Sequence, residues 1–137
     1  MLLTQKTLTL TKTIAILEPH EILRLCLIEV LSHLNYNILF KSGSAIDFIE
    51  MLATAEEQPD IIIAEVQLYD LQDISLFRHL RYHYPGIKLL AFSADDTERT
   101  VELVLQEGAD AFLAKGCSLQ QIQHALELVY RSELQPR

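Results

Sequence analysis

The sequence predicts an α/β domain built on a parallel sheet of five strands. Five short apolar segments recur along the 137 residues, and each is followed by a stretch with apolar residues at helical spacing. The apolar segments are continuous rather than alternating, which is typical of strands covered by helices on both faces. Strands that alternate with helices in this way form parallel sheets joined by right-handed crossovers.

The five predicted strands are rich in β-branched and aromatic residues. The third is the strongest, because three isoleucines, Ile61, Ile62 and Ile63, follow one another. The predicted strands are residues 13–17, 37–41, 60–64, 87–92 and 111–114.

Five amphipathic helices are predicted between and after the strands, and several carry end signals. Ser44 is a predicted N-cap, Gly108 stands where a glycine ends a helix, and Ser118 with Gln121 forms a capping box. The predicted helices are residues 21–34, 45–56, 73–83, 97–107 and 119–132. Their predicted apolar sides carry Leu23, Leu27, Val30, Leu31 and Leu34, then Ile46, Ile49, Leu52 and Ala53, then Ile74, Phe77 and Leu80, then Val101, Val104 and Leu105.

Composition narrows the class of protein. Half of the residues are hydrophobic, which is enough for a full core in one domain. Eleven basic against 19 acidic residues give a net charge of −8, so we expect no direct nucleic-acid binding by this domain. The two cysteines, Cys26 and Cys117, predict reduced thiols in a cytoplasmic protein. We expect no membrane segment, because no apolar run approaches about 20 residues.

The domain boundaries follow from the same pattern. Residues 13–132 form the predicted domain. Residues 1–12 are a predicted N-terminal arm or extra edge strand, and residues 133–137 a C-terminal tail.

Polar residues that follow the predicted strands mark a candidate site. In open parallel sheets, ligands bind beyond the carboxyl ends of the strands. Two acids, a hydroxyl and a lysine converge there, which favours a real or inherited site over loops that merely begin with polar residues. The residues that follow the strands are Glu18, Pro19 and His20, then Glu65, then Ser93 and Ala94, then Lys115.

These segments resemble the receiver domain of two-component response regulators over about residues 13–131. The matching segments are 16–20, 59–65, 92–94 and 108–115. The resemblance implies a doubly wound (βα)5 fold of the flavodoxin-like, CheY-like type. It implies an acidic pair that holds Mg²⁺ after the first strand and an aspartate that accepts a phosphoryl group from a histidine kinase after the third. A serine or threonine and a lysine contact that group, and an aromatic residue in the fifth strand repacks on switching.

Residue by residue, the resemblance is partial. Ser93 and Lys115 match the hydroxyl and lysine positions, and Phe112 matches the switch aromatic. Glu65 stands where the phosphoacceptor aspartate belongs, Glu18 replaces the first acid of the pair, and Pro19 replaces the second. Two further departures are Asp73, where the family usually has glycine, and Gly116, where many members have proline. Asp60 and Asp70 are not expected to be phosphoacceptors.

These departures predict weak or absent Mg²⁺ binding and no cofactor. Mg²⁺ requires near-octahedral oxygen ligands, and Pro19 offers no carboxylate. Glu18 and Glu65 are each one methylene longer than aspartate and would crowd the metal. Without the ion, phosphoryl transfer loses its charge neutralisation. Glu65 can instead pair with Lys115. Two interpretations stay open: a receiver held toward one conformation by this charge, or a vestigial site with a structural ion pair.

We therefore expect an atypical, non-enzymatic receiver, or pseudo-receiver, that signals through protein contacts independently of phosphorylation. The expected surface comprises residues 97–107, 111–114 and 119–131, and a homodimer is left open. The alternatives are a receiver still modified by a histidine kinase, and the receiver part of a transcriptional regulator whose DNA-binding domain is absent from this chain. A small flavodoxin-like enzyme or cofactor carrier finds no supporting loop in the sequence.

Two other candidate features are discounted. His79 and His83 lie four residues apart, but no third ligand is evident, so a solvated basic face is favoured over a metal site. Cys117 follows Lys115 closely, yet no partner histidine is in view, so a packed thiol is favoured over a reactive one.

Overall fold

The computed structural model describes residues 12–68 and 75–131. The predictions that fall on residues 1–11, 69–74 and 132–137 lie outside the described residues. Asp70, Asp73 and Ile74 are therefore not placed. The elements in chain order are β1 Thr13–Leu17, α2 Glu21–His33, β2 Asn37–Ser42, α3 Ala45–Thr54, β3 Ile61–Glu65, α4 Leu76–His83, β4 Lys88–Ser93, α5 Glu98–Gln106, β5 Ala111–Ala114 and α6 Leu119–Arg131.

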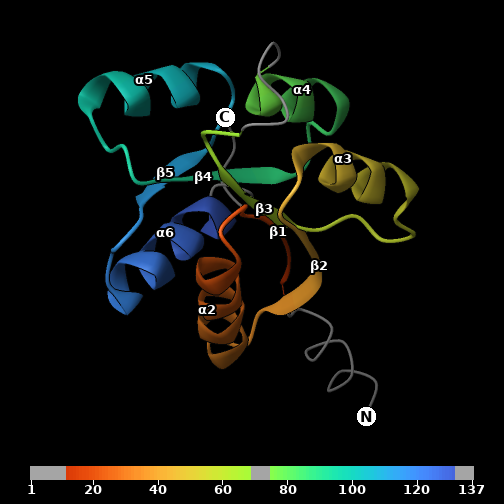
Figure 1. Ribbon diagram of the computed structural model, residues 1–137, viewed down its shortest axis with the longest axis horizontal. Helices are drawn as coiled ribbons and strands as arrows, with labels where there is room; N and C mark the ends of the chain where they lie inside the picture. Colours follow the sequence, from red (N-terminus) through yellow and green to blue (C-terminus); the bar gives the residue numbers. More distant parts are fainter. Residues whose placement is uncertain (1–11, 69–74, 132–137) are drawn as a thin grey trace.

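The five strands form one parallel sheet in the order β2-β1-β3-β4-β5. Helices α3, α4 and α5 cover one face, and α2 and α6 cover the other (Figure 1). The predicted α/β fold, doubly wound with five parallel strands, is confirmed. Because the order reverses at β1, the carboxyl ends of β1 and β3 meet at the switch point where such folds bind ligands.

The central strands are buried on both faces, as their continuous apolar sequences predict. Every residue of β1 and β3 is buried, and their side chains point alternately into two cores. Ile14, Ile16, Ile61 and Ile63 face α2 and α6, whereas Ile62 faces α3, α4 and α5.

Helix ends were predicted well where the chain carries a cap. Ser44 accepts a hydrogen bond from the Asp47 amide, and Ser118 and Gln121 exchange reciprocal hydrogen bonds. Ser75 caps α4, which begins at Leu76. The predicted start at residue 73 lies outside the described residues.

The strand boundaries differ slightly from the prediction. Asp60 lies just before β3 rather than opening it, and its carboxylate accepts hydrogen bonds from the amide and hydroxyl of Thr13. Glu65 and Ser93 are the last residues of β3 and β4 rather than the first residues of the following loops.

Two predicted helix faces were partly wrong. In α3, Ile46 is 57% exposed, and the buried residues are Ala45, Phe48 and Leu52. In α5, Val104 is buried but Leu105 is exposed. Both helices carry apolar residues on more than one side, so spacing alone left the buried face ambiguous.

Candidate functional site

Three polar side chains end neighbouring strands and are buried there. Glu18 follows β1 and is 1% exposed, Glu65 ends β3 and is 7% exposed, and Ser93 ends β4 and is 1% exposed. Parallel strands bring their carboxyl ends to one edge of the sheet, so the predicted convergence of these residues is observed. Buried carboxylates are unusual unless they are paired.

Lys115 supplies the pairing charge from the residue after β5. Its Nζ lies 2.8 Å from Glu18 Oε1 and also contacts Glu65 Oε1. The Lys115 main chain is anchored to β4, because its N–H donates to the Ser93 carbonyl at 2.9 Å. The predicted Glu65–Lys115 pair is therefore present, and Glu18 joins it as a second carboxylate on the same ammonium group.

The second oxygen of each glutamate is held by its own loop. Glu18 Oε2 accepts the His20 amide at 2.9 Å, and Glu65 Oε2 accepts the Gln67 amide at 2.9 Å. Each carboxylate thus has one oxygen on a backbone N–H and one toward Lys115, an arrangement that fixes its orientation. The groups surround a small cavity of about 300 Å³, lined by Glu18, Pro19, His20, Glu65, Gln67 and Lys115.

The electrostatics favour a charged lysine. Burial lowers the pKa of Lys115, but hydrogen bonds and charge attraction from Glu18 and Glu65 outweigh it, so the pKa is raised above its ordinary value. The ammonium is therefore retained at neutral pH, and the two carboxylates and one ammonium leave one net negative charge at the site.

Mg²⁺ does not fit this arrangement as it stands. The Lys115 ammonium lies between the two carboxylate oxygens that would have to face a metal, and the other two oxygens accept backbone N–H groups. Pro19 lines the cavity without a ligand atom in its side chain. Among the described residues, no group of three or more histidine, cysteine or acidic side chains is arranged to hold a metal ion.

Ser93 and Phe112 lie near the site but make other contacts. The Ser93 hydroxyl accepts the Asp95 amide at 3.0 Å, and Ser93 is not among the residues that line the small cavity. Phe112, in β5, is half-buried and packs at the edge of the core beneath α5. Among the described residues, the hydroxyl of Ser93 is hydrogen-bonded to the Asp95 amide and to no side chain of the charge cluster.

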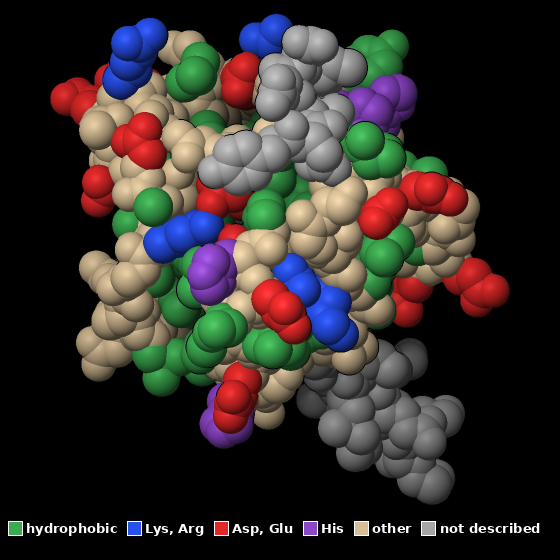
Figure 2. Space-filling view, in the orientation of Figure 1, with side chains coloured by type: hydrophobic (Ala, Val, Ile, Leu, Met, Phe, Trp, Pro, Cys, Tyr) green, Lys and Arg blue, Asp and Glu red, His purple; other side chains and the backbone are tan. Residues whose placement is uncertain are grey.

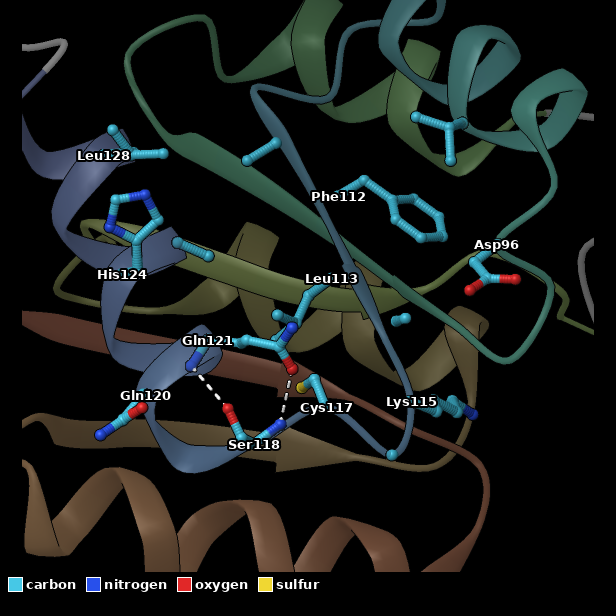
Figure 3. A pocket seen from close by; sticks show the side chains of 15 residues that line it. Asp96, Phe112, Leu113, Lys115, Cys117, Ser118, Gln120, Gln121, His124 and Leu128 are labelled. Carbon is cyan, nitrogen blue, oxygen red and sulfur yellow. Dashed lines mark hydrogen bonds between the residues drawn. The ribbon is translucent and has the colours of Figure 1, made fainter.

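A larger groove of about 1050 Å³ lies over β5 between α5 and α6. Phe112 and Asp96 lie on one side of it, and His124 and Leu128 project from α6 on the other (Figure 3). Lys115 is shared by the groove and the small cavity, so its position links the two.

Neither the His79–His83 pair nor Cys117, both discounted as functional features from the sequence, lies between the two carboxylates of the site. The rings of His79 and His83 on α4 have centroids 4.4 Å apart and planes tilted by 47°. Burial, partly offset by its own backbone N–H, raises the pKa of the Cys117 thiol, which disfavours the reactive thiolate. Gly116 has a backbone φ of 86°, a conformation that glycine adopts readily.

Sequence reasoning missed one residue at the site. Arg24, in the first turn of α2, donates from Nη1 to the Glu18 carbonyl oxygen at 2.7 Å. Its helical position predicts partial exposure, and only the folded geometry brings the guanidinium back over the end of β1.

Comparison with protein families identifies the fold's relatives. A family model described as the response regulator receiver domain matches residues 14–127. The chain is 24% identical over 121 residues to the response regulator GacA of Pseudomonas viridiflava, covering 88% of this chain and 56% of that protein. It is 31% identical over 72 residues to the probable C4-dicarboxylate response regulator DctR of Bacillus subtilis, covering 53% of this chain and 32% of that protein.

Solved structures give the same fold at low identity. The isolated REC domain of RcsB from Salmonella enterica serovar Typhimurium superposes with a TM-score of 0.79 at 13% identity, covering 88% of this chain and 89% of that one. A chain of the CheX–CheY complex from Borrelia burgdorferi superposes with a TM-score of 0.80 at 14% identity, covering 87% of this chain and 89% of that one. The chain spans about half the length of the GacA proteins it matches.

Proposed function

Because this chain belongs to the response regulator receiver domain family, we propose that it is a pseudo-receiver of two-component signalling. In this proposal Glu65 stands at the phosphoacceptor position and the domain acts without phosphorylation. It carries no catalytic activity of its own and works in the cytoplasm through contacts with other proteins.

One observation carries the proposal: the lysine that would contact a phosphoryl group already has two carboxylate partners. Lys115 Nζ lies 2.8 Å from Glu18 Oε1 and contacts Glu65 Oε1. Glu65 reaches the lysine with a side chain one methylene longer than aspartate. A carboxylate supplies one negative charge where a phosphoryl group supplies up to about two. Glu65 would therefore mimic a phosphorylated aspartate incompletely but permanently.

The same arrangement supports weak or absent Mg²⁺ binding. A divalent cation at this site would have to displace the Lys115 ammonium, and Pro19 replaces the second acid of the pair. Phosphoryl transfer to a carboxylate depends on a metal to neutralise the developing charge.

The first test is intact mass after incubation with acetyl phosphate and Mg²⁺, with an aspartate-containing receiver treated in parallel. We expect no gain of a phosphoryl group on this chain, whereas the parallel receiver gains one. Stable gain of one phosphoryl group, lost in Glu65→Gln, would instead support a receiver that a histidine kinase still modifies.

We propose that the partner surface lies over α5, β5 and α6. The groove of about 1050 Å³ carries the apolar side chains of Val101, Phe112 and Leu128 together with Asp96 and His124. On the face shown in Figure 2, Lys and Arg side chains lie singly among acidic ones, without the basic stripe that nucleic acid requires. Within the described residues, no helix is long and apolar enough to cross a membrane.

The second test separates mimicry from a vestigial site. Proteins captured by the wild-type chain are compared with those captured by Glu65→Gln and Glu65→Lys. Glu50→Lys is the matched control, because Glu50 is exposed on α3. Loss of a discrete partner in the Glu65 variants alone supports a charge-set conformation. Equal capture by all four proteins shows that the old phosphorylation site no longer controls binding.

A second candidate is favoured by the lengths of the relatives. The match covers 56% of GacA from Pseudomonas viridiflava and 30% of the transcriptional regulatory protein DegU of Brevibacillus brevis. This chain would then be the receiver part of a transcriptional regulator. Size-exclusion chromatography with light scattering on the chain tests the homodimer that such regulators would use.

A further inference from the structure

The main chain of Glu18 is held by a side chain from outside the sheet. Its N–H donates to the Ser42 carbonyl at 3.0 Å, as expected at the end of paired strands. Its carbonyl oxygen accepts Arg24 Nη1 at 2.7 Å. Glu18 Oε2 accepts the His20 amide, and buried Oε1, which has no hydrogen-bond partner, relies on the ion pair with Lys115 at 2.8 Å.

Gly43 leaves the space that the arginine fills. A Cβ built on Gly43 would lie 2.8 Å from Arg24 Nη1, whereas the Glu18 carbonyl oxygen and the Pro19 Cα would be 3.6 Å away, at ordinary contact. The φ angle of Gly43 is not in the positive range, so alanine suits the backbone. The guanidinium is therefore the only group that a methyl at this position would displace.

The Arg24 hydrogen bond supplies a donor that the Glu18 carbonyl needs. The Glu18 carbonyl precedes Pro19, whose own conformation is restricted, and a buried carbonyl without a donor is costly. The donor is a charged guanidinium, so its hydrogen bond to the Glu18 carbonyl is charge-assisted and stronger than one between neutral groups.

We propose that Arg24 is a positioning residue that holds Glu18 against Lys115, and that glycine is required at position 43 to let it do so. The inference concerns the ion-paired site itself, so it needs no partner protein and is tested separately from the proposed function.

The test measures how fast Lys115 is acylated by a trace amine-reactive reagent, with Lys41 and Lys88 of the same chain as internal references, by peptide mass spectrometry. Gly43→Ala keeps every charge but displaces the guanidinium, so we expect Lys115 to react several-fold faster relative to the references. Arg24→Met, which keeps a good helix former but removes the donor, is expected to do the same. Arg24→Lys is expected to restore part of the protection.

The double variant decides between positioning and two unrelated effects. With Arg24→Met already present, Gly43→Ala has nothing to displace, so Lys115 should react no faster than in Arg24→Met alone. Gly86→Ala is the matched control, because no atom lies within 4 Å of a Cβ built there.

Unchanged Lys115 reactivity in both single variants, or increases that add in the double variant, would overturn the proposal. Faster acylation of Lys88 in Gly43→Ala would show that this single variant unfolds. In that case the proposal requires that adding Arg24→Met to Gly43→Ala restores the fold. A double variant that stays unfolded contradicts it.

Discussion

Lys115 Nζ and Glu18 Oε1 lie 2.8 Å apart, although one residue follows the last strand of the sheet in sequence and the other follows the first. The contact spans the switch point of the sheet and also involves Glu65. It places a charge cluster at the carboxyl ends of β1 and β3, so the stability and, under the proposed function, the signalling state of this domain are expected to depend on the same three side chains.

Lys115→Met is expected to lower the free energy of unfolding by about 3 kcal/mol, because it leaves two buried carboxylates without their cation. Urea denaturation at pH 7 measures the loss. In the triple variant with Glu18→Gln and Glu65→Gln much of it should return, since no buried charge then remains. A single-variant loss below about 1 kcal/mol would show that the pair is largely solvated.

Stability is expected to fall in alkali. Burial raises the pKa of Cys117 and, with help from Glu127 and Tyr130, that of Tyr36. Burial lowers the pKa of Lys115, but the contacts with Glu18 and Glu65 outweigh it and raise the pKa overall.

Each of these groups binds its proton more tightly when folded. Its contribution is therefore complete below its ordinary pKa, 9.0 for Cys117, 10.0 for Tyr36 and 10.5 for Lys115, and is lost as the pH rises through the raised value. Urea midpoints should be flat from pH 7 to about 9 and then decline. Lys115→Met should remove the part of the decline that begins above pH 10.5, the ordinary pKa of Lys115. A midpoint that holds to pH 11 would contradict this.

Gly108→Ala is expected to be destabilising by about 1–3 kcal/mol. Gly108 has φ +121, and a Cβ there would lie 2.9 Å from the Arg81 Cβ. Arg81 in turn donates to the Gly108 carbonyl and pairs with Asp110 at 2.6 Å. Thermal denaturation against Gly86→Ala, which is expected to be neutral, isolates the effect. Equal melting of the two variants would show that the loop relaxes freely.

Ser118→Ala is expected to lower the free energy of unfolding by about 1 kcal/mol, because it removes the cap at the start of α6. The Ser118 hydroxyl accepts the Gln121 amide at 3.1 Å, and Gln121 Oε1 accepts the Ser118 amide at 2.8 Å (Figure 3). Ser118→Asp keeps an acceptor and should retain the stability in urea denaturation. If Ser118→Ala and Ser118→Asp lower the free energy of unfolding equally, loss of the cap does not explain the effect of Ser118→Ala.

Leu128→Ser is expected to weaken binding to a captured partner at least severalfold while changing stability by less than about 0.5 kcal/mol. Leu128 is 51% exposed on α6 and lines the groove over β5. Ile46→Ser is the matched control, since Ile46 is 57% exposed on α3, on the other face of the sheet. Equal weakening by both variants would place the partner elsewhere.

The sequence alone determined the order of strands and helices along the chain, and which polar residues lie at the carboxyl ends of the strands to within one position. Continuous apolar runs such as Ile61–Ile63 specify strands buried on both faces, and strand ends in a parallel sheet necessarily share one edge. That is why Glu18, Glu65 and Lys115 could be placed together without a structure.

Only the tertiary structure decided which atoms meet there. Local pattern does not encode that Arg24 turns back over Glu18, that Gly43 makes room for it, or that Ser93 bonds to Asp95. Nor does it choose the buried side of α3, where Ile46 and Phe48 are equally apolar. These outcomes depend on distances between segments remote in sequence, which packing sets only once the whole sheet has formed.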